Sequence, residues 1–408
     1  MSEAVAFDPL SPEFSADPYR TYRALREADK PYYFAAQDMW LLSRFEDIKA
    51  VAANPEMVRS LDGLENAEEA RERQRRANWH DMPYHERVVQ FSLLDSDGAV
   101  HRRLRKQVFG AFTSDALAGL EPRIAAFVEA RLDRLSDLEE IEFIEDFAAA
   151  IPGFVIGRLL GVDDADCPQL RIWSEQVVQF FDVDRSDARK EIAETATREF
   201  YHFLSDLRAE RRKVPRYDLI SRMIEDERNG LYTDDEFIST CMLILMAGHG
   251  STIDVLGTGM HTLLTQDDAM AQLRAYPDAL PGAIDEIFRF EPPLPFFHRH
   301  ALEETAIRGH SFPAGTTFGL LYGAGNRDPA AFSEPDQFDI ARRPNRHLAF
   351  GMGAHLCLGN NLAKLNMRVT FSALLQRFSR IEATDQTVRY KRGLSARGVE
   401  ALRICWQV

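Results

Sequence analysis

One cysteine, Cys357, stands in a setting that favours a reactive thiolate. It ends the segment FGMGAHLC and comes just before LGNNLAKLNMRV, a stretch with helical character. A helix N-terminus offers unpaired backbone N–H groups and a positive dipole end, which favour thiolate over thiol. Gly351 and Gly353 lack the Cβ atoms that would obstruct a flat ligand. A thiolate held in this way is a good axial ligand for haem iron, although many lone cysteines are only small buried hydrophobes.

A carboxylate and a guanidinium, Glu286 and Arg289, lie at i and i+3 in the apolar segment AIDEIFRF. This spacing places both on one helix face. In such apolar surroundings the pair could be buried and could take in a second arginine through bidentate bonds. A solvated surface ion pair is the simpler alternative for these two residues alone.

A long, buried helix is expected near the middle of the chain. The capping box Thr233-x-x-Glu236 opens a proline-free apolar stretch, FISTCMLILMAGHGSTIDVLGTGMHTLL. A helix that is apolar over such a length is expected to be buried through the middle of the molecule. Its four internal glycines each cost about 1 kcal/mol relative to alanine, which indicates that something large packs against its backbone.

The rest of the pattern predicts a mainly α chain with small β-sheets. In the first part of the chain we expect a helix from Asp17-Pro18 to about Glu27, a β-hairpin over PYYFAAQDMWLLS, a helix opened by a capping box at Ser43-x-x-Glu46, and a mobile charged loop with one short helix over 59–90. After it we expect helices over most of 99–264, a helix near 278–290, an irregular and strand-like stretch over 291–345, and a long helix from about Leu358. No Gly/Ser-rich or Pro-rich linker divides the sequence, so one domain over residues 1–408 is the simpler expectation.

Composition excludes several classes of protein. The net charge of −15 argues against a nucleic-acid binder, which needs a basic surface to neutralise phosphates. The sequence contains no run of about 18 apolar residues, so no membrane-spanning helix is expected. The N-terminal residues do not resemble a signal peptide. The four cysteines lie far apart without a CxxC pair, which is typical of reduced thiols and predicts a cytoplasmic protein.

Four segments together resemble the cytochrome P450 family of haem-thiolate monooxygenases, most closely its soluble bacterial branch. They are FGMGAHLCLG, EIFR upstream of it, AGHGST on the long helix, and HRRLR earlier in the chain. The cysteine loop is a highly specific motif, and the likeness runs over nearly the whole chain. The resemblance implies the P450 fold, with haem b between the long central helix and the helix that follows the cysteine loop.

The resemblance also implies roles for individual residues. Cys357 corresponds to the ligand of the iron. Glu286 and Arg289 correspond to the paired helix residues, and Arg342 in FDIARRP to their third member, with Arg343 as the alternative.

Haem carboxylates need cationic partners, because burying them unpaired is costly. By resemblance these partners are His101 and Arg105, at i and i+4, together with Arg299 and His355. The full set of residues expected to bind the cofactor is His101, Arg105, Ala247, Gly248, Arg299, Phe350, Gly351, His355, Cys357 and Gly359.

The central helix departs from the family pattern. Where the family commonly has an acid followed by threonine, which relay protons to bound dioxygen, this chain has Gly250 and Ser251. Ser251 can still donate a hydrogen bond, and Thr252 follows about 100° further round the helix. Asp254 lies one turn after Gly250 and could replace the acid through water. The alternative for Asp254 is a purely local hydrogen bond or cap.

The substrate pocket is expected to be apolar, as ligand pockets mostly are. Position along the chain, rather than any motif, suggests the residues that line it. They are Phe91, Leu245, Leu294, Phe296, Phe297 and Leu394.

The resemblance implies insertion of one oxygen atom from O2 into an apolar small organic substrate. No flavin or nicotinamide fingerprint is present, so electrons are expected from a ferredoxin and its NAD(P)H-dependent reductase. The basic cluster of Arg102, Arg103, Arg105 and Lys106 is a candidate landing site for the ferredoxin. Because the acid is missing, a peroxide-dependent or non-oxygenating haem-thiolate enzyme stays open. A haem sensor or carrier is a third reading.

Overall fold

The computed structural model describes residues 6–90, 92–266, 268–384 and 387–407. The chain divides into two compact units. Unit 1 comprises Met1–Met57, Glu121–Ile151 and Ser251–Val408, and unit 2 comprises Val58–Leu120 and Pro152–Gly250. Both units interleave along the sequence, so no linker separates them in the chain. The expectation of one domain over the whole length stays a prediction.

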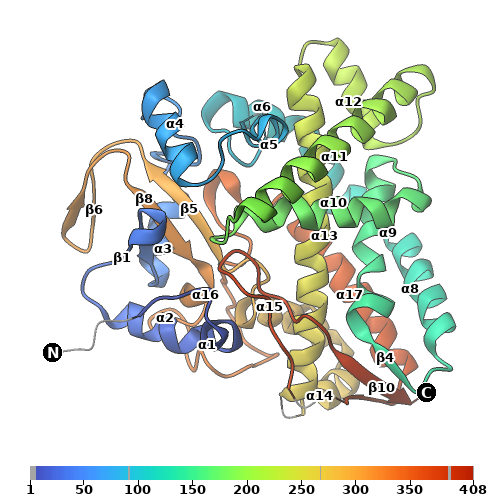
Figure 1. Cartoon of the computed structure of the whole chain (residues 1–408). Helices are drawn as coiled ribbons and strands as arrows, with labels where there is room; N and C mark the ends of the chain where they lie inside the picture. Colours follow the sequence, from blue (N-terminus) through green and yellow to red (C-terminus); the bar gives the residue numbers. More distant parts are fainter. Residues whose placement is uncertain (1–5, 91, 267, 385–386, 408) are drawn as a thin grey trace. The chain divides into compact units, whose positions relative to one another are not determined.

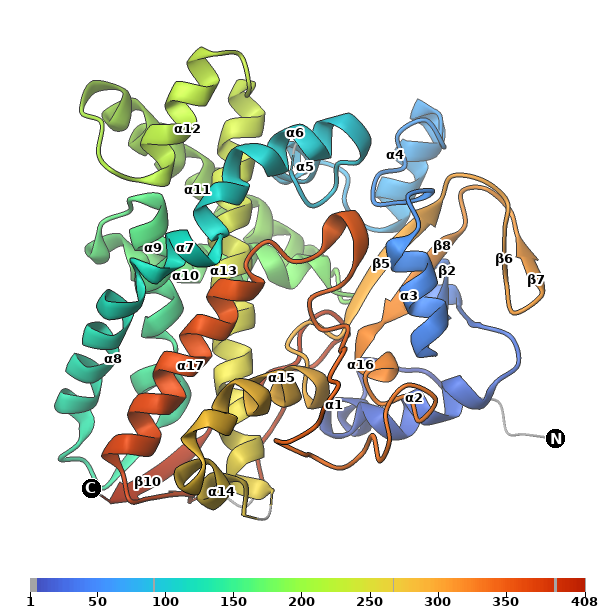
Figure 2. The ribbon, with the colours of Figure 1, turned by 180° about the vertical axis from the view of Figure 1, so that it is seen from behind.

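Unit 1 contains a mixed sheet with strand order β1-β2-β8-β5-β3. As the sequence predicted, β1 (Tyr32–Phe34) and β2 (Met39–Leu42) form an antiparallel hairpin. β2 continues parallel to β8 (Thr317–Leu321), which pairs antiparallel with β5 (Phe296–Ala301). Helix α3 (Phe45–Ala53) packs on this sheet through a buried apolar cluster (Figure 2). The two smaller sheets are β4-β10-β9 and β6-β7.

The remaining elements of unit 1 are mainly helices and short strands. Helices α17 and α8 lie side by side, and α15 packs on α17 (Figure 2). Their bounds, with those of the other elements, are α1 (Pro12–Ala16), α2 (Pro18–Glu27), β3 (Met57–Val58), α8 (Glu121–Leu135), β4 (Glu140–Glu142), a π-helical turn (Phe143–Ala148), α14 (Ala269–Ala275), α15 (Leu280–Phe290), β6 (Thr305–Ile307), β7 (His310–Phe312), α16 (Tyr322–Gly325), α17 (Asn360–Arg377), β9 (Arg380–Ala383) and β10 (Arg403–Gln407).

One predicted helix start in unit 1 is wrong. The N-cap of α3 is Arg44, not Ser43, and its side chain makes no capping bond. Instead, the Asp328 carboxylate accepts a hydrogen bond of 2.8 Å from the backbone N–H of Phe45. A residue 283 positions away therefore caps this helix, which a local motif cannot reveal.

Unit 2 is built of helices. They are α4 (Ala67–Arg76), α5 (Pro83–Gln90), α6 (Gly98–Phe109), α7 (Ser114–Ala118), α10 (Cys167–Val178), α11 (Asp187–Lys213) and α12 (Leu219–Arg228), with most of α9 (Ala150–Leu160). The prediction of a loop with one short helix over 59–90 was wrong, because the segment holds both α4 and α5. Helix α4 is rich in charged residues and has no buried one, and a capping box at Asn66 and Glu69 holds its start.

Helix α13 (Asp234–Thr265) is the long helix predicted from the sequence (Figure 1). Its capping box forms as expected: Thr233 N–H donates to the Glu236 carboxylate, and Glu236 N–H donates to Thr233 Oγ1. By length and composition α13 could cross a membrane, but 72% of its most apolar window is buried inside the protein. That degree of burial is typical of a core helix.

Candidate active site

The cysteine loop reaches α17 through two glycines in left-handed conformations. Gly351 has φ +67° and Gly353 has φ +72°, which side chains with a Cβ rarely adopt. A Cβ on Gly353 would also stand 2.6 Å from the carbonyl oxygen of Ala52 on α3. The loop then closes on itself, because the Cys357 N–H donates to the Phe350 carbonyl at 2.8 Å. Both glycines are therefore required to place Cys357.

Cys357 lies half-buried two residues before the N-cap of α17, Gly359. Asn360 Nδ2 donates to the Cys357 carbonyl at 2.7 Å and fixes the turn into the helix. A Cβ built on Gly359 would meet no atom within 4 Å, so this face of the loop has room for a flat group. The positive end of the helix dipole favours negative charge here.

Behind the loop, Glu286 and Arg289 on α15 are both fully buried, at 0% exposed. Arg289 Nη2 and Nε donate to the two carboxylate oxygens of Glu286, each at 2.7 Å. Arg342 Nε adds a second cation at 3.1 Å, and Asn345 Nδ2 donates at 3.0 Å. Burial lowers the pKa of Arg289 from its ordinary value, and the Glu286 carboxylate opposes that shift. We call these four residues the Glu286 lock.

The Glu286 lock also ties down the segment that leads to the cysteine loop. Arg289 donates to the carbonyls of Asn326, Pro335 and Gln337. Arg342, rather than Arg343, is the third member; the Arg343 guanidinium instead lies where a Cβ of Gly282 would be. The sequence prediction that this pair is buried and takes in a second arginine matches this geometry.

Two of the expected haem-carboxylate partners belong to unit 1. Arg299, on β5, is 2% exposed, and its Nη1 donates to the His298 carbonyl at 2.8 Å. His355 lies half-buried in the 3-10 turn Gly353–His355 of the cysteine loop. Phe350 packs its ring 4.5 Å from that of Phe288 on α15.

The other expected partners belong to unit 2. His101 is buried on α6, and Arg105 is half-buried one turn further along. Ala247 is exposed, and Gly248 half-exposed, in the middle of the mostly buried helix α13. Behind Gly248, a Cβ would meet Ile156 at 2.9 Å, so glycine is needed for helix packing there.

The AGHGST segment forms regular α-helix, and its acid slot is open. A Cβ built on Gly250 would meet no atom within 4 Å. Ser251 is half-exposed, whereas Thr252 is 5% exposed. Asp254 is buried and forms an ion pair of 2.7 Å with Lys391, from a hairpin near the C-terminus. Asp254 is thus already engaged by a cation in this structure.

The comparisons with known proteins agree with one another. The family model for cytochrome P450 matches residues 278–398. The biotin biosynthesis cytochrome P450 of Bacillus subtilis is 32% identical over 99% of this chain and all of its own length. The 6-deoxyerythronolide B hydroxylase of Saccharopolyspora erythraea is 33% identical over 97% of each chain. The chain belongs to the cytochrome P450 family.

Solved structures show the same P450 fold. A P450BioI bound to an acyl carrier protein ligated with hexadec-9Z-enoic acid has a TM-score of 0.90 at 30% identity, covering 97% of this chain and 100% of that one. A myxobacterial cytochrome P450 bound to myristic acid has a TM-score of 0.90 at 31% identity, covering 98% of each. This P450 is accordingly a haem-thiolate monooxygenase that uses protoporphyrin IX haem.

The residues present fit that cofactor. A half-buried thiol stands at a helix N-terminus, Gly359 two residues later faces open space, and a buried arginine, Arg299, lies in the same unit. In unit 2 the exposed Ala247 gives α13 a small apolar surface at mid-length. These are the donor and the shapes that a flat, iron-bearing ring with anionic groups requires.

The expected pocket residues of this P450 differ in their surroundings. Leu294 and Phe296 are half-buried at the start of β5, and Phe297 packs against Tyr322 and the sheet cluster. Leu245 and Leu394 are fully buried. Phe91 lies outside the described residues.

Sequence reasoning missed the ionic contacts of the C-terminal hairpin. Arg397 is buried and donates through Nε to the Glu291 carboxylate and through Nη1 to the Ser15 carbonyl at 3.0 Å. Lys391 pairs with Asp254, as described above. No local spacing links these partners, although the charged residues in RYKRGLSARG were a signal that the segment needs counterions.

Proposed function

We propose that Cys357 is the thiolate ligand of the haem iron. The observation that carries this assignment is the cysteine loop itself, with two left-handed glycines and a closing hydrogen bond that place the thiol at the N-terminus of α17. Within unit 1, Arg299 and His355 would hold the carboxylates, and Gly351 and Gly359 would leave room for the ring. His101 and Arg105 of unit 2 stay predictions from the family resemblance. When bound, thiolate-ligated haem activates O2 so that one oxygen atom enters the substrate and the other leaves as water.

The chain's own residues supply protons and exclude water. We propose that Ser251 Oγ is the hydroxyl that donates a hydrogen bond and passes a proton on, since Gly250 provides no acid. Thr252 is buried in the helix packing and serves as support. Asp254 as a water-linked acid stays a prediction, and its pairing with Lys391 favours another role.

We propose an apolar, hydrocarbon-rich small organic molecule as substrate. The half-buried Leu294 and Phe296, both in unit 1, support an apolar lining. Two similar structures bind a carrier-linked hexadecenoic acid and myristic acid, and a similar enzyme is named for hydroxylating 6-deoxyerythronolide B. Titrating the ferric spectrum with free fatty acids, acyl carrier protein esters, macrolides and small aromatics tests the proposal. A low-to-high-spin shift with one class is expected, and polar ligands shifting the spectrum instead would contradict it.

We propose a ferredoxin with its NAD(P)H-dependent reductase as electron donor, in the cytoplasm. Arg102 and Lys106 are exposed on α6 and fit an acidic partner. Arg103 is withdrawn from that surface, because its guanidinium bonds to Glu236 and to the Leu231 carbonyl. The landing site is therefore smaller than the sequence cluster suggested.

A peroxide-driven reaction is the second candidate, favoured by the open acid slot at Gly250. Peroxide already carries the oxygen, the electrons and the protons that the other route must deliver. Product formation with peroxide alone, and none with NADH, ferredoxin and reductase, would support this candidate over the first.

A further inference from the structure

A short hairpin near the C-terminus, residues 389–400, is held between α13 and the N-terminal segment, all within unit 1. We call it the C-terminal hairpin. Its strands are joined by a Tyr390–Val399 bridge and by hydrogen bonds from Lys391 N–H to the Gly398 carbonyl and from Glu400 N–H to the Arg389 carbonyl. Its tip carries the fully buried Leu394, one of the expected pocket residues.

One face of α13 receives this hairpin. Asp254, Gly257 and His261 follow each other at i, i+3 and i+7, which places them on one side of the helix. His261 Nδ1 lies 3.2 Å from the Tyr390 hydroxyl. A Cβ on Gly257 would stand 3.1 Å from the Val399 side chain, so the hairpin packs close to the helix backbone.

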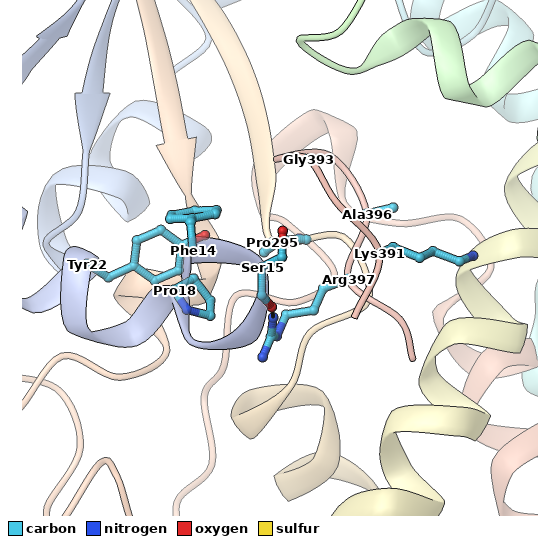
Figure 3. A pocket seen from close by; sticks show the side chains of 9 residues that line it. All are labelled: Phe14, Ser15, Pro18, Tyr22, Pro295, Lys391, Gly393, Ala396 and Arg397. Carbon is cyan, nitrogen blue, oxygen red and sulfur yellow. Dashed lines mark hydrogen bonds between the residues drawn. The ribbon is translucent and has the colours of Figure 1, made fainter. Parts of the chain in front are cut away.

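The Asp254 carboxylate is the polar centre of this contact. It is 4% exposed, whereas the Lys391 side chain that pairs with it is 40% exposed. Figure 3 shows the Lys391 side chain extending from the hairpin toward α13. On the opposite strand, a Cβ on Gly398 would overlap the carboxylate, so only glycine lets this strand lie over Asp254. A buried carboxylate needs such a partner, because its charge is otherwise costly to bury.

The other side of the hairpin is tied to the segment that leads into β5. The Arg397 N–H donates to the Pro293 carbonyl at 2.9 Å, next to the pocket candidate Leu294. A small crevice, lined by Pro295 together with Gly393 and Ala396 of the tip, separates the tip from this segment (Figure 3). The hairpin tip is therefore held on one side by the contact of Lys391 with Asp254 and on the other by the contact of Arg397 with Pro293.

We propose that Asp254 and Lys391 are positioning residues whose ion pair fixes the tip of the C-terminal hairpin against α13, and thereby sets the shape of the substrate site. Lys391 lies three residues before Leu394 in the hairpin, and Asp254 lies about one helical turn after Ser251 on α13. The pair couples the tip to the helix turn that carries the proposed proton donor. This inference rests on the proposed function, because it takes Leu394 and Ser251 to face substrate.

The test compares Lys391→Met with wild type in the holoenzyme. Two ligands of the ferric iron serve as probes: imidazole, which needs little space, and phenylimidazole, whose ring reaches into the substrate site. We expect the Kd of phenylimidazole to change about three- to tenfold and that of imidazole to stay within about twofold. Amide hydrogen exchange of residues 390–399 should accelerate in the same variant, which reports the loosened hairpin directly.

Matched variants keep the outcome specific. Lys391→Arg keeps the charge and should restore both readouts, whereas Arg389→Met removes an exposed cation from the same hairpin and should change neither. Gly398→Ala should loosen the hairpin by steric overlap if Lys391→Met does not fold. Unchanged exchange and unchanged phenylimidazole affinity in Lys391→Met, or equal effects in Arg389→Met, would overturn the proposal. A wild-type protein that binds no haem would contradict the proposed function instead, while hydrogen exchange would still test the ion pair.

Discussion

The cysteine loop and the AGHGST segment of α13 both carry residues that we propose take part in P450 chemistry, but the two segments are held in different ways. The loop is fixed by left-handed glycines, a closing hydrogen bond and the Glu286 lock behind it, whose central pair of Glu286 and Arg289 is fully buried. The AGHGST segment is plain helix, with an exposed Ala247 and an empty acid slot at Gly250. From this difference we expect changes in the cysteine loop to be tolerated poorly, and changes at exposed positions of the AGHGST segment to be tolerated better.

The largest effect is expected at Cys357. Cys357→His would keep a metal-binding side chain but lose the thiolate, whose electron donation favours O–O cleavage. We expect monooxygenase turnover to fall to background while haem is still bound. Single-turnover product analysis measures the loss of activity, and the absorption spectrum measures the bound haem. Cys405→Ser is the matched control, since it removes a thiol from β10 and should leave turnover unchanged.

The Glu286 lock should rank next. Glu286→Gln leaves the buried Arg289 without its countercharge, and breaking a buried pair in this way costs about 3–5 kcal/mol. Urea unfolding of the holoprotein and its haem content would show the loss. In Glu382→Gln the pair with Arg380 is about half-exposed on both sides, so the cost should stay below about 1 kcal/mol. Equal costs in the two variants would mean that the lock does not hold the loop.

A smaller and opposite effect is expected in the helix. Gly250→Glu introduces an acid where the structure leaves open space, so it should fold normally. General acid catalysis is typically worth about a hundredfold or more, and even a poorly placed acid should raise the yield of product per NADH severalfold. The ratio of product to hydrogen peroxide measures this coupling. Gly250→Gln has the same shape without the acid, so a similar gain there would remove proton delivery as the reason.

The smallest effect is expected on the surface of α6. Charge-reducing Arg102→Ala with Lys106→Ala should raise the apparent KM for ferredoxin about three- to tenfold at low salt, and less at high salt. Arg75→Ala on α4 changes an exposed charge elsewhere in unit 2 and serves as the control. Steady-state reduction rates at two ionic strengths would distinguish the α6 double variant from the Arg75→Ala control. The same dependence on ferredoxin concentration in both variants would exclude α6 as the landing site.

Some features of the molecule could be predicted from the sequence, and others could not. A capping box and an i, i+3 ion pair are local patterns, so the start of α13 and the buried Glu286–Arg289 pair could be predicted from the sequence. The cysteine loop was recognised by its motif. The cap of α3 by Asp328 and the pairing of Asp254 with Lys391 join residues far apart in the chain. Such partners become visible only in the folded chain. Helix α4 was missed for another reason, because its charged, exposed sequence has no apolar period.

The most direct test of the central assignment is the absorption spectrum of the purified protein after reduction under carbon monoxide. If Cys357 binds the iron as a thiolate, the ferrous–CO complex should show the red-shifted Soret band of thiolate ligation, and Cys357→His should lose it. A wild-type protein that binds haem but shows the Soret position of histidine ligation would contradict the account, as would a protein that binds no haem.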